Sequence, residues 1–253
     1  MFRPRIIPVL LLKDQVLVKT TRFSNPKYIG DPINAVKIFN DLRADELVFL
    51  DISATREQRC ISVDFVREVG EEANMPFAVG GGITTIEQLR TLISAGAEKV
   101  IIGSKAAQDN DFIRNASDTF GASTIVVCMD VKKKFLGSEQ AFIVNGTKST
   151  GLNPVEYAIE IQNQGAGEII VQSIDHDGCM NGYHLDLIAK VSAAVTIPVV
   201  ALGGAGNLQH MRDAYHQAHA TALAAGSMFV FYGPNKAVLV NYPSAEEIRN
   251  LFE

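Results

Sequence analysis

Glycine-rich segments that could hold an anion occur twice in this chain at a constant spacing. The first pair is Gly80-Gly81-Gly82 with Gly103-Ser104, and the second is Gly203-Gly204-Ala205-Gly206 with Gly226-Ser227. Corresponding glycines of the two pairs stand 123 positions apart. Glycine backbone N–H groups next to a serine hydroxyl are typical phosphate ligands. The spacing predicts two facing anion sites and an elongated substrate with an anionic group at each end.

Four aspartates and one lysine could act on such a substrate. Asp130 closes a predicted strand between the two anion sites, where a carboxylate can serve as general acid or base, or can cap the following loop. Lys19 lies in a segment that could fold over a phosphate, although a loop lysine can equally be solvated. Asp51, Asp175 and Asp177 also follow predicted strands. For the last two, turn formation competes with substrate contact.

Four charged residues open predicted strands at the opposite end of the sheet: Arg5, Glu46, Lys99 and Glu168. Two cations and two anions around one barrel axis could form a ring of paired charges. Four separately solvated side chains are the alternative, and the residues alone favour that reading.

Short β-branched runs alternate with longer helical patterns throughout the chain. The predicted strands are near Arg5–Leu12, Glu46–Asp51, Phe77–Val79, Lys99–Ile102, Thr124–Asp130, Glu168–Ser173, Val199–Leu202 and Thr221–Ala225. The predicted helices are near Pro32–Leu42, Glu57–Glu72, Ile86–Ala95, Asp111–Phe120, Pro154–Asn163, Asp186–Val191, Leu208–Gln217 and Ala245–Phe252. Eight strands, each followed by a helix, predict an α/β fold: a single (β/α)8 TIM barrel. We expect one domain over residues 1–253, with half-barrels of about 1–122 and 123–253.

Two predicted connections are unusually long, and both follow carboxyl ends of strands, where barrel enzymes build their sites. They cover Lys13–Asp31, which contains Lys19, and Val131–Asn153. The second should fold partly as a hairpin, because an apolar run at 141–144 precedes Asn145-Gly146, a strong turn signal.

Composition bounds the remaining possibilities. The 253 residues are 47% hydrophobic but contain no apolar run long enough to predict a membrane span. A net charge of −5, with Lys132-Lys133-Lys134 as the longest basic run, argues against nucleic-acid binding. Cys60, Cys128 and Cys179 lack metal-ligand spacing. We therefore expect a cytoplasmic protein with reduced thiols, no metal and no cofactor.

Several segments together resemble the cyclase subunit of imidazole glycerol phosphate synthase, the HisF family, across essentially the whole chain. They are Arg5-Ile6-Ile7, Gly30-Asp31-Pro32, 45–52, 79–83, 165–169 and 203–206. The resemblance implies a lyase subunit that receives ammonia from a HisH-like glutaminase at the amino-terminal barrel face and conducts it through the barrel. Arg5, Glu46, Lys99 and Glu168 match the family's gate residues, which favours the ring over four solvated charges.

The chain departs from the family pattern at the cyclisation end. The family uses two aspartates, and Asp130 matches the second, but the strand-1 aspartate is Leu11 here. The family's serine before the seventh-strand glycines is Leu202, and its asparagine ending the fourth strand is Gly103. Loss of a positioned acid or base typically lowers a rate by about 10²–10⁴-fold.

The segments 7–13 and 23–32 resemble a branch of the family, the glycosyl-amidation-associated (WbuZ-type) proteins of surface-polysaccharide clusters. That resemblance implies a phosphorylated or nucleotide-linked substrate, a third amidotransferase protein and an amidino group formed on an N-acetyl sugar. We take this as the leading hypothesis and a genuine cyclase as the alternative. A non-catalytic scaffold that activates the glutaminase stays open. A phosphosugar isomerase or aldolase is disfavoured, because such enzymes need no charged ring.

Overall fold

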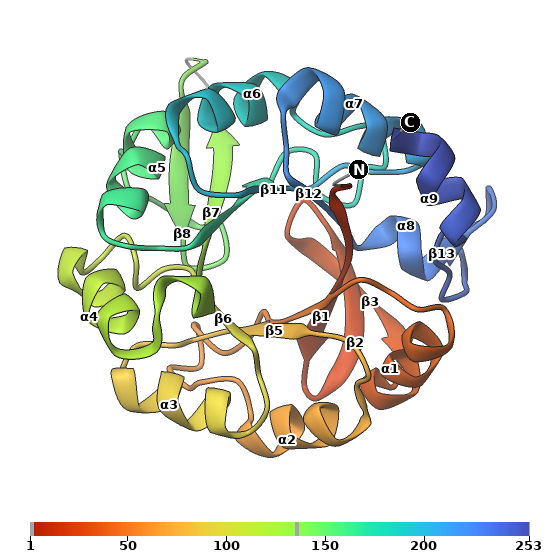
Figure 1. The fold of residues 1–253 in the computed structure, drawn as a ribbon, viewed down its shortest axis with the longest axis horizontal. Coiled ribbons are helices and arrows are strands. Elements are labelled where there is room, and N and C mark those ends of the chain that lie inside the picture. The colour runs from red at the N-terminus through yellow and green to blue at the C-terminus, as the bar shows by residue number, and fades with distance from the viewer. Residues whose placement is uncertain (1–2, 135–136, 253) are drawn as a thin grey trace.

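Eight parallel strands close into a barrel in the computed structural model, which describes residues 3–134 and 137–252 (Figure 1). Pairing of β12 with β1 and of β7 with β10 completes the circle. The barrel strands are β1 (Arg5–Lys13), β4 (Leu47–Asp51), β5 (Phe77–Gly80), β6 (Lys99–Ile102), β7 (Ile125–Lys133), β10 (Glu168–Ser173), β11 (Val199–Leu202) and β12 (Ala222–Ala225). The predicted (β/α)8 fold is confirmed.

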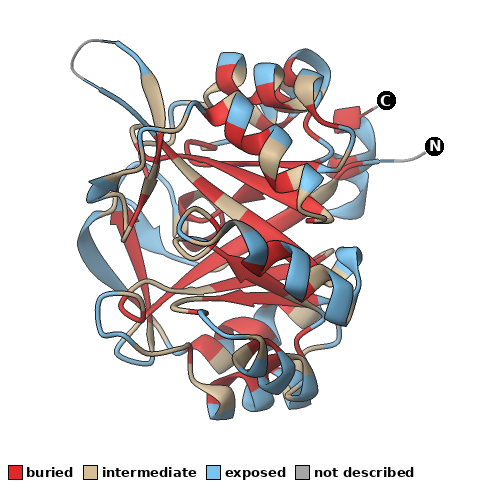
Figure 2. Cartoon of the chain, turned by 90° about the vertical axis from the view of Figure 1, so that its left-hand side faces the viewer, coloured by how far each residue is buried: buried red, intermediate tan, exposed pale blue. Residues whose placement is uncertain are grey.

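Helices surround the barrel, with their exposed faces outward and the buried strands inside (Figure 2). One apolar cluster lies between strands and helices, and a second fills the barrel interior. The helices are α1 (Pro32–Asp41), α2 (Val63–Glu72), α3 (Ile86–Ser94), α4 (Asn110–Phe120), α5 (Pro154–Asn163), α6 (Leu185–Ala194), α7 (Leu208–Ala218), α8 (Ser227–Val230) and α9 (Ala245–Phe252), with a 3-10 turn at Ala122–Thr124. Both clusters hold the strand ends in fixed positions.

The predicted helix over Glu57–Glu72 is wrong at its start. The helix begins at Val63, because the Ser62 side chain caps it by accepting from the N–H of Phe65. The preceding residues serve the barrel mouth instead: Arg59 pairs with Asp51, and the N–H of Ile61 donates to the carbonyl of Gly81.

Both long connections contain β-hairpins. The first, β2 (Val16–Thr21) and β3 (Ser24–Gly30), pairs antiparallel with β1, although the sequence predicts only a long connection there. The second, β8 (Glu139–Ile143) and β9 (Lys148–Ser149), pairs with the extended end of β7 and confirms the predicted hairpin. A separate hairpin, β13 (Phe231–Tyr232) and β14 (Ala237–Val238), lies outside the barrel next to α8 (Figure 1).

No helix within the described ranges is both long and apolar enough to span a bilayer. The same part of the chain holds no cluster of three or more His, Cys, Asp or Glu side chains that could bind a metal ion.

Candidate functional site

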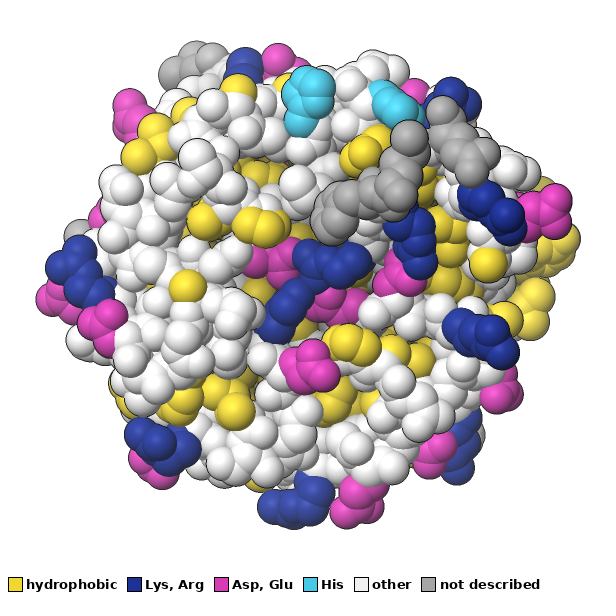
Figure 3. All heavy atoms as spheres, viewed as in Figure 1, with side chains coloured by type: hydrophobic (Ala, Val, Ile, Leu, Met, Phe, Trp, Pro, Cys, Tyr) yellow, Lys and Arg dark blue, Asp and Glu magenta, His cyan; other side chains and the backbone are white. Residues whose placement is uncertain are grey.

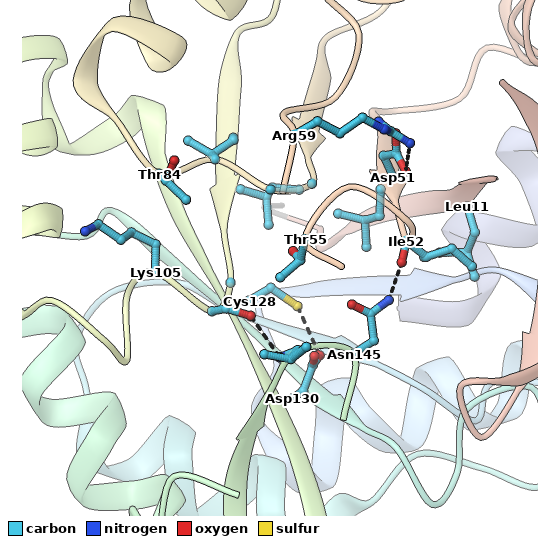
Figure 4. Close-up of a pocket in the computed structure, with 18 of the residues that line it drawn as sticks. Leu11, Asp51, Ile52, Thr55, Arg59, Thr84, Lys105, Cys128, Asp130 and Asn145 are labelled. Carbon is cyan, nitrogen blue, oxygen red and sulfur yellow. Dashed lines mark hydrogen bonds and ion pairs between the residues drawn. The ribbon is translucent and has the colours of Figure 1, made fainter. Parts of the chain in front are cut away.

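A cavity of about 560 Å³ opens at the carboxyl ends of the barrel strands (Figure 4). Its lining comes from five barrel strands (β1, β4, β6, β7 and β10), from the loops that follow β4, β5 and β6, and from the β2–β3 and β8–β9 hairpins. Predicted site residues that line it are Asp51, Gly81, Gly82, Gly103, Ser104 and Asp130. This is the face on which barrel enzymes carry their active sites.

Asp130 is half-buried in the wall of this cavity that lies opposite Leu11. The pKa of its carboxyl is raised to about 7. Burial is the largest cause, the charge of Asp177 also raises the pKa, and the hydrogen bond from the Cys128 thiol lowers it. The Cys128 Sγ lies 3.7 Å from both Asp130 Oδ1 and Gln172 Oε1, and burial holds the pKa of that thiol well above its usual range. Asp130 can therefore take up or release a proton near neutral pH.

The raised pKa of Asp130 makes stability depend on pH. Because the folded-state pKa of about 7 exceeds the ordinary value of 3.8, the wild-type protein should lose stability as pH rises from about 4 to 7. Asp130→Asn removes this titration. The variant should gain in unfolding free energy relative to wild type between pH 5 and pH 8, as measured by urea denaturation. A difference that stays constant over this range would contradict the raised pKa.

Leu11 occupies the end of β1, opposite Leu50 in the neighbouring strand β4. It is 6% exposed and lines the same cavity as Asp130 (Figure 4). With Leu50 and Ile52 it gives one wall of the cavity an aliphatic surface. Leu11 cannot donate or accept a proton, so a reaction in this cavity that needs proton transfer depends on Asp130 on the opposite wall.

Of the residues of the first predicted anion site, Gly81, Gly82, Gly103 and Ser104 line the cavity, and Gly80 does not. Gly82 has a φ of +63°, and a Cβ there would lie 1.8 Å from the carbonyl oxygen of Arg59, so only glycine fits. Ser104 Oγ accepts from the N–H of Val144 at 2.9 Å and keeps its own proton free to donate. Gly80 lies within β5 and does not line the cavity.

Asp51 lies in the cavity wall, but both of its carboxylate oxygens are engaged. Arg59 donates to Oδ2 at 2.6 Å, and the N–H groups of Ser53 and Ala54 donate to Oδ1. Asp51 therefore holds the loop after β4 in place and positions Arg59 at the cavity.

The second predicted anion site is a small cavity of about 10 Å³. Predicted residues that line it are Lys19, Asp177, Gly203, Gly204, Gly226 and Ser227. Lys19 is 6% exposed and lies over the glycine turn, with its Nζ 3.4 Å from Asp177 Oδ1. Ser227 Oγ is buried and has no hydrogen-bond partner within residues 3–134 and 137–252. A buried cation beside an unsatisfied hydroxyl suits an anion.

The position of Lys19 excludes the alternative of a solvated loop lysine. Lys19 lies on β2, and two hydrogen bonds connect the β2–β3 hairpin to the loop after β10. Thr20 Oγ1 donates to Asp177 Oδ2 at 3.1 Å, and the N–H of Arg22 donates to the carbonyl of Asp177. Asp177 thus holds the β2–β3 hairpin in place and also lines the small cavity.

Two further predicted residues lie elsewhere. Asp175 lines neither anion cavity, because its Oδ2 accepts from the N–H of Lys133 at 3.0 Å. Gly206 lines a separate cavity outside the barrel. Sequence reasoning missed Arg59 and Gln172 in the main cavity. The alternation that points Glu168 inward along β10 could have identified Gln172, but nothing in the sequence pattern distinguishes Arg59.

The four charges at the amino-terminal end form a closed ring. The Arg5 guanidinium contacts Glu46 and Glu168, and Lys99 Nζ lies 3.1 Å from Glu46 Oε1 and 3.0 Å from Glu168 Oε2. Both glutamates are buried. Charged side chains gather at the centre of this face in the space-filling view (Figure 3). Four separately solvated side chains are therefore excluded.

Above the ring, the barrel interior is apolar up to the level of Cys128 and Gln172. This layer consists of Ile7, Val48, Ala78, Ile101, Val126, Ile170, Val200 and Ala222. The axis of the barrel thus runs from a charged ring through an apolar layer to the cavity that holds Asp130.

These features define a (β/α)8 barrel protein with a cavity at the carboxyl ends of its strands and an ionic ring at the opposite end. A family model described as "Histidine biosynthesis protein" matches residues 5–233, and the chain belongs to this family.

Close relatives cover the chain from end to end and confirm the resemblance to the HisF family. The chain is 43% identical over 254 residues to "Putative imidazole glycerol phosphate synthase subunit hisF3" of Vibrio vulnificus, and the matched region covers 100% of this chain and 98% of the relative. It is 44% identical over 256 residues to "Putative imidazole glycerol phosphate synthase subunit HisF" of Leptospira interrogans, which covers 100% of both. It is 41% identical over 248 residues to "Imidazole glycerol phosphate synthase subunit HisF" of Natranaerobius thermophilus, with 98% of each chain covered.

Proposed function

We propose that this HisF-family chain conducts ammonia from a HisH-like glutaminase to an acceptor at the carboxyl-terminal cavity, for amidation of an N-acetyl sugar of a surface polysaccharide. The proposal rests on the aliphatic wall at Leu11, which faces Asp130 in the cavity. The ionic ring at the other end of the barrel is intact. The end of the barrel that handles ammonia is complete, whereas the position of one acid–base group of the cyclase reaction is filled by leucine.

The interior of the barrel supports the passage of neutral ammonia. Burying an ammonium ion in an apolar layer is strongly unfavourable, whereas NH3 carries no charge. Arg5, Glu46, Lys99 and Glu168 close the entrance and act as the gate of this passage. The glutaminase then docks on the same face, in agreement with the word "subunit" in the names of the relatives.

The two anion sites supply the contacts to the acceptor. Gly81, Gly82, Gly103 and Ser104 bind one polar group of it, and Lys19 and Ser227 bind a phosphate at the other end. Asp130 moves the proton that must leave when ammonia becomes a nitrogen of the product. Replacement of an amide oxygen by nitrogen requires prior activation of that oxygen, which is the role of a third, amidotransferase protein.

The second candidate is a genuine cyclase subunit of imidazole glycerol phosphate synthase. Retention of Asp130, of Lys19 and of glycine at both anion sites favours it, as do the names of the relatives. Leu11 counts against it.

Gene deletion in the source strain separates the two candidates. The amidation proposal predicts that the purified polysaccharide loses its acetamidino groups and carries acetamido groups instead, as read by mass spectrometry, while growth without histidine is unchanged. Expression in a histidine auxotroph that lacks its own cyclase subunit should give no growth. Unchanged polysaccharide together with restored growth would overturn the proposal in favour of the cyclase.

A further inference from the structure

A third cavity, of about 410 Å³, lies outside the barrel beside the β13–β14 hairpin. Met180, Met228, Tyr232, Lys236 and Asn241 are among the residues that line it. None of them belongs to the cavity that holds Asp130. The proposed function gives this cavity no role.

The outer cavity adjoins the second anion site along three segments of the chain. Gly178, Ala205 and Ser227 line the anion site. Met180, Gly206 and Met228, one or two positions further along the same segments, line the outer cavity. The two cavities are therefore neighbours, so a group attached to a phosphate at the anion site can reach the outer cavity.

The side chains of the outer cavity suit a flat heterocycle. Tyr232 is 65% exposed, and the thioethers of Met180 and Met228 provide polarisable surface for an aromatic ring. Asn241 donates through Nδ2 to the carbonyl of Leu239 at 2.9 Å, which leaves its Oδ1 free to accept from a ring or exocyclic N–H. Lys236 is exposed and makes no ion pair with the described residues, so it can bind a second phosphate.

We propose that the outer cavity binds the nucleoside of a nucleotide-linked substrate, with the base stacked on Tyr232 and the adjoining phosphate at Lys19 and Ser227. The proposal rests on the anion site of the proposed function and narrows the substrate class to a nucleoside phosphate. It also assigns a binding role to the β13–β14 hairpin.

Binding measurements with three probes test this assignment. By isothermal titration calorimetry, uridine or adenosine 5′-monophosphate should bind about tenfold more tightly than ribose 5-phosphate, because a stacked base contributes binding energy that a sugar does not. Inorganic phosphate reports on the anion site alone. Tyr232→Ala should reduce nucleotide affinity to that of ribose 5-phosphate without changing the latter, and Tyr232→Phe should retain the nucleotide preference.

Tyr28→Ala is the matched control, because Tyr28 is 67% exposed and lines none of the three cavities. It should leave all affinities unchanged. Equal affinity for nucleotide and ribose 5-phosphate, or a nucleotide preference that survives Tyr232→Ala, would overturn the nucleoside assignment while leaving the anion site intact. If the wild-type protein binds none of the three probes, the anion site is overturned, and the nucleoside assignment falls with it.

Discussion

Replacing Lys99 by methionine is expected to lower the free energy of unfolding by about 3–5 kcal/mol, because removal of one member of a buried ionic group leaves its partners uncompensated. Glu46 and Glu168 are 4% and 6% exposed, and each contacts both Lys99 and Arg5. Without Lys99, two buried carboxylates share one guanidinium. Urea denaturation at neutral pH measures the loss.

An exposed ion pair on the same face provides the control. Arg3 is paired with Asp45 at 2.6 Å, but its side chain is 46% exposed, so Arg3→Met should cost about 0–1 kcal/mol. Adding Glu168→Gln to Lys99→Met should restore part of the lost stability, since Arg5 and Glu46 then form a balanced pair. Equal effects of Lys99→Met and Arg3→Met would show that the ring is not a buried ionic network.

Leu11→Asp is expected to raise ammonium-dependent formation of imidazole glycerol phosphate by on the order of 10²-fold, the lower end of what a positioned acid or base supplies. The end of β1 places residue 11 in the same cavity as Asp130, so a carboxylate there completes the pair that the family resemblance implies. Gly103 and Leu202 remain altered, which limits the gain. Steady-state turnover of the family's bis-phosphate substrate with saturating ammonium measures it.

Leu11→Asn separates proton transfer from polarity, because asparagine matches aspartate in size but cannot exchange a proton at neutral pH. It should leave turnover at the wild-type level. A comparable gain from aspartate and asparagine would mean that the aliphatic wall merely repels the substrate. No gain from either would exclude Leu11 as the residue that limits cyclase activity.

The barrel and its two ends were predictable because they depend on periodic patterns. Alternation along each strand places Arg5, Glu46, Lys99 and Glu168 at equivalent strand starts, which makes a ring possible, but the residues alone favoured solvated charges and the family resemblance was needed to predict the ring. The recurrence of glycines at equal spacing likewise predicted which loops would line the two cavities. Gly82 shows why a glycine is required at such a position, since a Cβ there would overlap the carbonyl oxygen of Arg59.

The loops at the barrel mouth were less predictable, because tertiary contacts decide their conformation. Lys19 is buried only because the β2–β3 hairpin is fastened to Asp177, a residue 158 positions away. The segment before α2 has a helical pattern, but Arg59 is held by Asp51, and residues 59–62 form neither helix nor strand before the Ser62 cap. Such long-range pairs leave no periodic signal in the sequence.

The separate environments of the two anion sites were also beyond sequence reasoning. Repeat-equivalent glycines predicted equivalent sites, yet Gly103 and Ser104 lie in a roomy cavity with an aliphatic wall, whereas Gly226 and Ser227 lie beneath a buried lysine. The β2–β3 hairpin contributes to both cavities, but with different residues: Thr20 and Phe23 line the large cavity, whereas Lys19 lines the small one.

Turnover of the wild-type protein with ammonium and the bis-phosphate substrate of imidazole glycerol phosphate synthase tests most directly whether the cyclisation end has lost its function. The HisF subunit of Natranaerobius thermophilus, assayed in parallel, provides the reference. We predict a rate at least about 100-fold below the reference, in keeping with the loss of one positioned acid–base group. A rate equal to the reference would contradict the account and identify the chain as a working cyclase.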